Sequence, residues 1–268
     1  MQLHKTSQLI SRSVFNATGK QIWTRFPWID TEKYHKTPEV LTKTRKGYPI
    51  QILPQGFMSS QIYWAGCFEP QLSEKLENIL SPGDLFVDAG ANIGYFTLLS
   101  AHKISSTNKK GRVISFEPCL STFKILEENV ASNGLSDTVD FFRIGLSDSE
   151  ESKKLYISEY SALNTFCSNP VNKETSTGKT EIVEVKPLDS FYNLFTSNFE
   201  KCVIKIDVEG LEKQVLNGAR LWLEDERTKH VVFECFKNLN SLKVILNQYN
   251  FQLDEEPLAR ETYIASRI

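Results

Sequence analysis

The last two thirds of the chain alternate short apolar runs with segments of helical periodicity, and this alternation restricts the fold more than any other feature of the sequence. The apolar runs are LFVDAG, RVISFEP, VDFFRIG, CVIKIDVEG and HVVFEC, and YIASRI is a last candidate near the end. Runs of this length, bounded by turn residues, are typical of strands covered on both faces. Strands that alternate with helices build right-handed βαβ units on a mainly parallel sheet. The sequence therefore predicts an α/β domain.

The N-terminal part of the chain lacks this alternation. Residues 1–36 have weak helical periodicity with several aromatic residues, and residues 39–66 are typical of short strands separated by turns. Residues 71–80 place four apolar side chains on one helical face, and a Ser-Pro-Gly sequence ends that helix. We therefore divide the chain into an N-terminal arm with a β-rich segment over 1–80 and a main domain over 81–268.

The composition indicates a folded protein without covalent or metal cross-links. The 268 residues are 40% apolar and include 31 Lys and Arg against 33 Asp and Glu, so a large core can form. The five cysteines contain no Cys-x-x-Cys pair, which is typical of free thiols in a reducing compartment. The apolar runs are too short for a transmembrane helix, which needs about 20 residues. We expect a cytoplasmic protein with no transmembrane segment.

A polar insertion interrupts the alternation between the third and fourth predicted strands. It lies near residues 155–190, and its most polar part, residues 169–180, is rich in Gly, Pro, Ser and Thr. Such composition is typical of an exposed loop. We expect a hairpin inserted between two strands of the main sheet.

The first apolar run of the main domain leads directly into the sequence DAGANIG. Asp88 ends the predicted strand, and Gly90 and Gly94 flank a short turn before a helix. Glycines allow a ligand to approach the backbone, and the first N–H groups of a helix are unpaired. Ligands of open α/β sheets bind at such a turn. Asn92 and Tyr95 replace two glycines of the dinucleotide fingerprint, whereas Asp88 favours a ligand with an ammonium group, such as S-adenosylmethionine. The alternative is a turn that only packs a helix against a strand.

Two later strand ends agree with a bound nucleoside. Glu117 follows the next strand, 23 residues after Gly94, where a carboxylate can accept hydrogen bonds from both ribose hydroxyls. Ser147 and Asp148 follow the third strand, where a small side chain and a carboxylate suit the amino edge of adenine. The alternatives are a surface glutamate and a plain turn.

These motifs together resemble the FkbM group of class I S-adenosylmethionine-dependent methyltransferases. The resemblance rests on FVDAGANIGYFTLL, ISFEP, VKPLDSF, VIKIDVEGLEKQVLNGA and VVFECF, and covers roughly residues 45–240. It implies a Rossmann-like, seven-stranded, mainly parallel sheet with helices on both faces and one antiparallel strand near its edge. It also implies methyl transfer to a hydroxyl of a carbohydrate-containing or polyketide-like small molecule or glycan.

The resemblance assigns the site residue by residue. The cofactor loop contains Asp88, Gly90, Ala91, Asn92 and Gly94, Glu117 and Pro118 hold the ribose, Ser147 and Asp148 lie near the adenine, and Asp207, Glu209 and Gly210 form the turn after the fourth strand. The insertion around residues 160–180 departs from the family pattern where substrate-facing loops lie.

The run VIKIDVEG gathers ionisable residues at the end of a central strand. Alternation directs Lys205, Asp207 and Glu209 to the same side while the strand stays extended. A hydroxyl is a weak nucleophile, so we expect Asp207, and next Glu209, to act as general base or as an acceptor beside the cofactor. Lys205 would neutralise neighbouring carboxylates. The alternatives are a buried ion network with a purely structural role and a Mg²⁺ site formed by Asp207, Glu209 and Glu234.

The sequence gives little indication of a nucleic-acid partner. The segment after the fourth strand is Asp-Val-Glu-Gly, not the Asn/Asp-Pro-Pro-aromatic sequence of nucleic-acid amino methyltransferases. Residues 1–49 carry nine Lys and Arg against three Asp and Glu, which is typical of a solvated basic surface or of an anionic partner. Two other functions stay open: a non-catalytic, cofactor-binding scaffold subunit of a biosynthetic assembly, and methylation of a protein or a lipid.

Overall fold

One large sheet organises the chain in the computed structural model. The structure describes residues 39–53, 56–106, 109–167, 175–195, 199–254, 256–259 and 261–268. The weak helical pattern predicted over residues 1–36 therefore lies outside the described residues.

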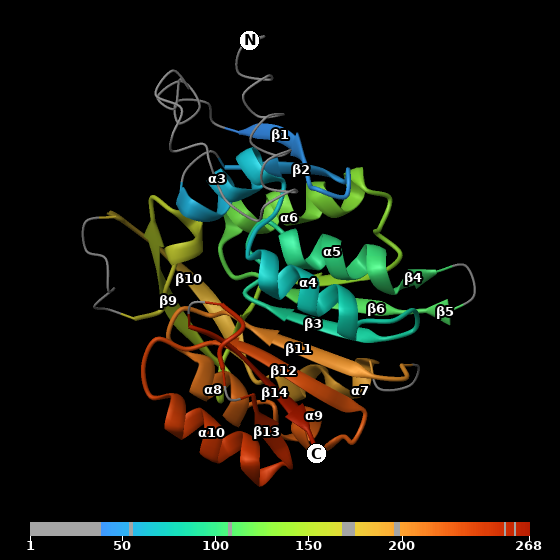
Figure 1. The fold of residues 1–268 in the computed structure, drawn as a ribbon. Helices are drawn as coiled ribbons and strands as arrows, with labels where there is room; N and C mark the ends of the chain where they lie inside the picture. The colour runs from blue at the N-terminus through green and yellow to red at the C-terminus, as the bar shows by residue number, and fades with distance from the viewer. Residues whose placement is uncertain are drawn as a thin grey trace.

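The large sheet has seven strands in the order β13-β14-β12-β11-β3-β6-β7. Five of them run parallel: β3 (Leu85–Ala89), β6 (Arg112–Phe116), β7 (Val139–Phe142), β11 (Cys202–Ile206) and β12 (Thr228–Glu234). Strand β14 (Thr262–Arg267) is antiparallel to β12 and to the edge strand β13 (Phe251–Leu253). This topology confirms the predicted Rossmann-like sheet with one antiparallel strand near its edge (Figure 1).

Helices cover both faces of this sheet, and each face has its own hydrophobic core. On one face lie α4 (Pro70–Ile79), α5 (Tyr95–Ile104) and α6 (Leu120–Ser132), and on the other lie α8 (Glu212–Asn217), α9 (Arg220–Glu224) and α10 (Leu239–Gln248). Alternation sends Phe86 and Val203 into the first core and Val87 and Ile204 into the second. All residues of β3 and β11 are buried, which explains why these strands are continuous apolar runs.

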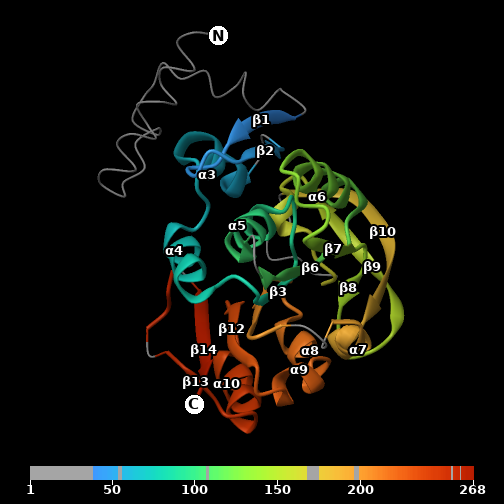
Figure 2. The same cartoon turned by 90° about the vertical axis from the view of Figure 1, so that its right-hand side faces the viewer.

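The β-rich prediction for residues 39–66 is partly wrong. Strands β1 (Val40–Lys43) and β2 (Pro49–Ile52) form a hairpin, but the next segment is a helix, α3 (Gly56–Ala65). Its buried Met58, Ile62 and Ala65 lie four and three residues apart, a helical spacing that reaches one side of the core. Figure 2 shows β1, β2 and α3 together at one end of the molecule.

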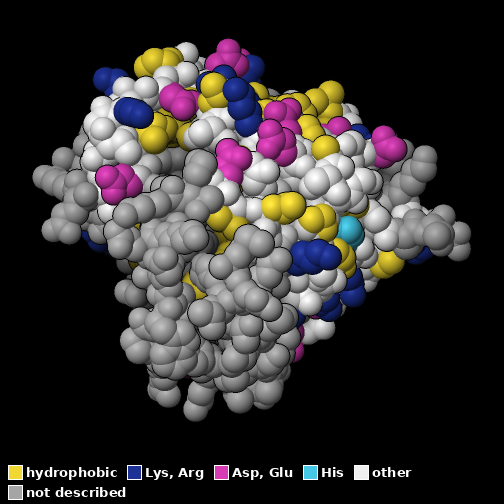
Figure 3. Space-filling model, turned by 90° about the horizontal axis from the view of Figure 1, so that it is seen from above, with side chains coloured by type: hydrophobic (Ala, Val, Ile, Leu, Met, Phe, Trp, Pro, Cys, Tyr) yellow, Lys and Arg dark blue, Asp and Glu magenta, His cyan; other side chains and the backbone are white. Residues whose placement is uncertain are grey.

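The N-terminal segment packs into the same core as the main sheet. Ile50, Ile52 and Leu72 belong to the cluster that contains Phe86 and Leu98. Figure 3 views this end of the molecule from above, where basic and acidic side chains are intermixed with hydrophobic ones.

A second, three-stranded sheet has the order β8-β10-β9. Strands β9 (Glu151–Ser158) and β10 (Ser176–Lys186) form an antiparallel hairpin in the region of the predicted insertion, and β8 (Gly145–Leu146) pairs in parallel with β10. The loop predicted over residues 169–180 is wrong for residues 176–180, which belong to β10, and residues 169–174 lie outside the described residues.

Short elements complete the described chain. They are β4 (Ser105–Ser106), β5 (Lys109–Lys110), η2 (Ser161–Leu163), η4 (Leu188–Phe191) and α7 (Tyr192–Phe195). All five cysteines are free. Within the described residues, each helix is too short or too polar to cross a lipid bilayer.

Candidate functional site

The cofactor loop, residues 90–94, joins β3 to α5 and has a left-handed backbone at three positions. Gly90, Asn92 and Gly94 have φ values of 80°, 51° and 88°. A Cβ atom on Gly90 would lie 1.8 Å from the backbone carbonyl oxygen of Asp207, which no side chain tolerates. The N–H groups of Gly90 and Ala91 donate to the carbonyl oxygen of Phe116 at 3.0 Å. Gly90 is therefore required because the loop passes directly against the chain that follows β11.

Glu117 lies at the end of β6, next to the cofactor loop. Its Oε2 atom accepts the N–H of Asn92 at 2.8 Å, and its Oε1 atom accepts the N–H of Cys119 at 2.9 Å and the hydroxyl of Thr122 at 2.8 Å. Burial raises the pKa of Glu117 to about 7, although these hydrogen bonds oppose the rise. A carboxylate oxygen has two acceptor positions, so Oε2 keeps one. The role of Glu117 at the two ribose hydroxyls stays a prediction.

A buried lysine on β11 pairs with the carboxylates of Asp88 on β3 and of Asp207 just after β11. Lys205 Nζ lies 3.3 Å from Asp88 Oδ1 and 3.3 Å from Asp207 Oδ2, and the Thr97 hydroxyl donates to Asp88 Oδ2 at 2.7 Å. Burial alone would lower the pKa of Lys205, but the charges of Asp207, Asp88 and Glu69 raise it above its usual value. Lys205 therefore stays charged and neutralises its neighbours, as the sequence predicts. Asp88 is fully buried, and each of its two carboxylate oxygens has one of these internal partners.

Three further carboxylates form a cluster at the ends of β11 and β12. One oxygen atom each from Asp207, Glu209 and Glu234 lies within 4.8 Å of the other two. Burial and the charge of Asp207 raise the pKa of Glu209 to about 8, and burial with the charges of Asp207, Glu209 and Glu69 raises that of Glu234 to about 9. Asp207, Glu209 and Glu234 are the residues predicted from the sequence as an alternative Mg²⁺ site. Because the three carboxyl groups are close together, a bound cation there would favour their charged forms.

The structure adds a carboxylate that the sequence analysis missed. Glu69 precedes α4, and its pKa is raised to about 7 by burial and by the charge of Asp207, while the charge of Lys205 opposes the rise. The only local signal is Pro70, which is typical of the first position of a helix. That signal predicts that Glu69 lies at the start of a helix, but it assigns no chemical role to the side chain.

A single segment of the β9–β10 hairpin contacts both loops of the site. We call residues 159–167 the cover segment and residues 207–210 the carboxylate loop. The hydroxyl of Ser161 donates to Asn92 Oδ1 at 3.1 Å, and the hydroxyl of Thr165 donates to the Glu209 carbonyl oxygen at 2.9 Å. The cover segment therefore bridges the cofactor loop and the carboxylate loop.

Ser147 and Asp148 make contacts of a different kind. The buried Ser147 hydroxyl accepts from Lys153 Nζ at 3.2 Å and donates to Asp148 Oδ1 at 3.4 Å. A Cβ atom on Gly218 would lie 2.1 Å from the Ser147 carbonyl oxygen. These contacts join Ser147 to β9 and to the end of α8. The adenine role of Ser147 and Asp148 stays a prediction, as does the place of the half-buried Pro118 beside the ribose.

Comparison with known proteins gives a consistent family. The family described as the methyltransferase FkbM domain matches residues 88–253. The chain is 27% identical over 228 residues to methyltransferase sdnD of Sordaria araneosa, covering 75% of this chain and 83% of that protein. It is 29% identical over 160 residues to methyltransferase 1 of Beauveria bassiana, covering 54% and 61% of the two chains.

Solved structures similar to this one include two methyltransferases. Methyltransferase FkbM from Methylobacillus flagellatus aligns with a TM-score of 0.44 and 16% identity over 72% of this chain and 50% of that chain. A SAM-dependent O-methyltransferase from Thermotoga maritima aligns with a TM-score of 0.41 and 14% identity over 88% and 80% of the two chains.

Proposed function

The chain belongs to the methyltransferase FkbM family, and from this premise we propose that it is an S-adenosylmethionine-dependent O-methyltransferase. Its acceptor would be a hydroxyl of a carbohydrate-containing or polyketide-like small molecule or glycan. The observation that supports this proposal is the close contact between two loops. The cofactor loop after β3, where Gly90 leaves no space for a side chain, packs against the carboxylate loop after β11. Ligands of open α/β sheets bind at the carboxyl ends of such neighbouring strands.

The residues present fit this cofactor. The cofactor loop, with Gly90, Ala91, Asn92 and Gly94, would hold its amino-acid end, and the remaining acceptor position of Glu117 suits a ribose hydroxyl. S-Adenosylmethionine carries an ammonium and a sulfonium group, and a cation bound near the three carboxyl groups beyond the loop would favour their charged forms. Asp88 would act through Lys205 and the loop, because both of its oxygens have internal partners.

The residues of the chain have two tasks in this reaction. The bound cofactor supplies a methyl group on a good leaving group, so the protein must mainly align the acceptor and exclude water. The second task is to accept the proton of the acceptor hydroxyl. Asp207 and Glu209 are the candidates predicted from the sequence, and Lys205 Nζ lies 3.3 Å from Asp207 Oδ2. The cover segment is hydrogen-bonded to both loops, a position from which it would limit the access of water.

Calorimetry followed by product analysis tests this proposal. We expect the full chain to bind S-adenosylmethionine and to methylate at least one member of a panel of glycosides and polyketide-like alcohols, detected by mass spectrometry. Binding without turnover on any panel member would favour the non-catalytic scaffold or a protein or lipid acceptor. Binding of a nicotinamide or flavin nucleotide in place of S-adenosylmethionine would contradict the proposal altogether.

A further inference from the structure

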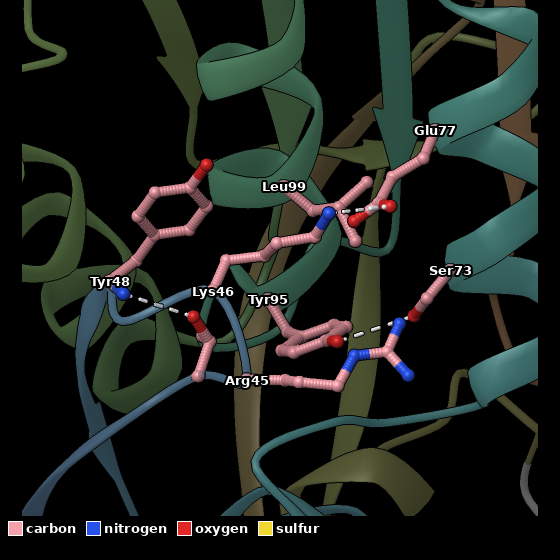
Figure 4. Close-up of a pocket in the computed structure, with 8 residues that line it drawn as sticks. Arg45, Lys46, Tyr48, Ser73, Glu77, Tyr95 and Leu99 are labelled. Carbon is pink, nitrogen blue, oxygen red and sulfur yellow. Dashed lines mark hydrogen bonds and ion pairs between the residues drawn. The ribbon is translucent and has the colours of Figure 1, made fainter. Parts of the chain in front are cut away.

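The turn before α4 is fixed to the first turn of α5. The buried Tyr95 hydroxyl lies 3.2 Å from Ser73 Oγ and donates to Cys67 Sγ at 3.4 Å, and the Ser73 hydroxyl donates to the carbonyl oxygen of Phe68 at 2.7 Å. Figure 4 shows Tyr95 and Ser73 pointing toward each other at this junction. Residues 67–73 are therefore held against the helix that begins at the end of the cofactor loop.

Aromatic side chains in edge-on and tilted contacts connect this turn to the buried lysine. The Phe68 ring centroid lies 6.2 Å from that of Tyr95 and 5.8 Å from that of Phe96. Lys205 Nζ lies over the Phe96 ring, 5.2 Å from its centroid. The residue that follows Phe68 is thus brought beside the charged centre of the site.

That residue is Glu69, and its backbone is held in an uncommon conformation. Its φ and ψ are 40° and 74°, in the left-handed region, which costs a residue other than glycine on the order of 1 kcal/mol. Its N–H donates to Gln61 Oε1 at 3.2 Å, and its carbonyl oxygen accepts the N–H of Ser73 at 2.8 Å. Its half-buried carboxylate has no hydrogen-bond partner among the described residues. Such strain is often found at functional sites.

We propose that Glu69 is a catalytic residue of this methyltransferase, whose carboxylate contacts the acceptor hydroxyl and takes its proton. This inference rests on the proposed function. As the O–H bond breaks, the proton passes to Glu69 and the oxygen lone pair forms the new C–O bond. The C–S bond breaks, and its electron pair stays on sulfur, which becomes a neutral thioether. Asp207 then has a positioning role, because its Oδ2 atom is paired with Lys205.

The charges around Glu69 suit this role. The facing groups are Asp207 and Lys205 at β11 and Glu234 on β12. Burial raises the pKa of Glu69 to about 7, and a general base works best when its pKa lies near the working pH. Glu209 and Glu234 have pKa values of about 8 and 9, so both are mainly protonated at pH 7. Glu69 lies outside residues 88–253, so the N-terminal segment would complete the site.

Glu69→Gln in the full chain tests the proposal. With the panel member that the wild-type protein methylates fastest, we expect kcat to fall by roughly a hundredfold and the acidic limb of the pH profile near pH 7 to disappear. Cofactor affinity should stay within twofold, and Glu69→Asp should recover part of kcat. Asp207→Asn should keep the acidic limb. Glu74→Gln, an exposed glutamate on the same helix, is the matched control and should leave kcat unchanged.

Several results would overturn the assignment. An unchanged kcat in Glu69→Gln would do so, as would an acidic limb that persists there but vanishes in Asp207→Asn. A second measurement needs no acceptor: ¹³C NMR titration of glutamate-labelled protein with bound S-adenosylhomocysteine. A resonance that titrates near pH 7 and is missing in Glu69→Asp supports the proposal, and titration of Glu69 near its ordinary pKa of 4.5 rejects it. A wild-type protein that binds no cofactor refutes the proposed function instead.

Discussion

The two halves of the proposed site differ in the hydrogen-bond partners of their carboxylates. In the cofactor half, at the ends of β3 and β6, Asp88 has Thr97 and Lys205 as partners, and Glu117 accepts three hydrogen bonds. In the acceptor half, at the ends of β11 and β12, the carboxylates of Glu209 and Glu234 have no hydrogen-bond donor among the described residues. The carboxylates of the first half have protein partners, whereas Glu209 and Glu234 in the second half have none among the described residues.

This difference has an energetic basis. Burying a carboxylate without donors is costly, so its pKa rises until the group holds a proton or a cation binds nearby. Burial accordingly raises the pKa values of Glu209 and Glu234 to about 8 and 9. We infer that the cofactor half is built to keep its shape and the acceptor half to change its protonation state. The following substitutions separate these properties.

Lys205→Met should have the largest effect on stability, because Lys205 pairs with a carboxylate in each half of the site. Its loss leaves the fully buried Asp88 without a counter-ion, which typically costs about 3–5 kcal/mol of stability. Urea unfolding measures this loss. Lys201→Met is the matched control, since it breaks a pair with the buried Asp84 at 3.0 Å at the opposite end of the sheet. The control should lower stability while cofactor binding stays intact. A Lys205→Met protein as stable as the wild type would show that Asp88 needs no charged partner.

Gly90→Ala should disrupt the cofactor half alone. The new Cβ atom would meet the Asp207 carbonyl oxygen at 1.8 Å, so the loop must move, and we expect affinity for S-adenosylmethionine to fall about a hundredfold or more, or roughly 2.7 kcal/mol. Gly134→Ala has the same left-handed backbone, with φ of 68°, but open space around it. Calorimetry should show normal binding for this control. Equal binding by both variants would mean that the close approach at Gly90 does not shape the cofactor loop.

Asp207→Asn should affect the acceptor half. The amide keeps the shape of the side chain but removes the negative charge beside Lys205, so we expect kcat to fall at least about tenfold while cofactor affinity is spared. Asp140→Asn is the control, since it weakens an exposed ion pair with Arg112 on the cofactor side of the sheet. Unchanged turnover in Asp207→Asn would remove this residue from the reaction.

The local structure of the half where we place the cofactor could be predicted from the sequence because it depends on neighbouring residues. The turn needs glycine at defined positions, and a strand buried on both faces is a continuous apolar run. The segments DAGANIG and ISFEP can therefore be recognised in the sequence as a turn and a strand end. The alternation in VIKIDVEG likewise predicts that Lys205 and Asp207 meet, and they do. Helix α3 was missed because QIYWAG has the aromatic and β-branched residues of a strand, and only packing reveals its helical spacing.

The acceptor half is harder to predict because distant segments assemble it. Glu69, Glu209 and Glu234 come from the start of α4, the carboxylate loop and the end of β12. No local pattern distinguishes Glu69 from the other glutamates near it. Its position depends on tertiary contacts through Phe68 and Tyr95, which sequence periodicity does not encode.

Glu234→Gln should change the pH dependence of stability. The pKa of Glu234 is raised from 4.5 to about 9 in the folded protein. A raised carboxyl pKa contributes stability that is fully present below pH 4.5 and is lost as the pH rises through about 9. The uncharged amide avoids this loss, so Tm of the ligand-free variant should exceed that of the wild type at pH 9 and match it at pH 5. Glu224→Gln, an exposed glutamate paired with Arg220, should show no such pH-dependent gain.

Ser161→Ala should have the smallest effect, and it tests whether the two halves communicate through the cover segment. The variant loses one partly buried hydrogen bond to Asn92 Oδ1, worth about 0.5–1.5 kcal/mol, so cofactor affinity should fall about threefold. Ser149→Ala, which loses a hydrogen bond to Glu151 beside the same hairpin, should bind normally. If the bridge couples the halves, Ser161→Ala should also shift the acidic limb of the pH profile, because Thr165 on the same segment contacts Glu209. A change in affinity with an unchanged pH profile would mean that the cover segment supports the cofactor loop without linking it to the carboxylates.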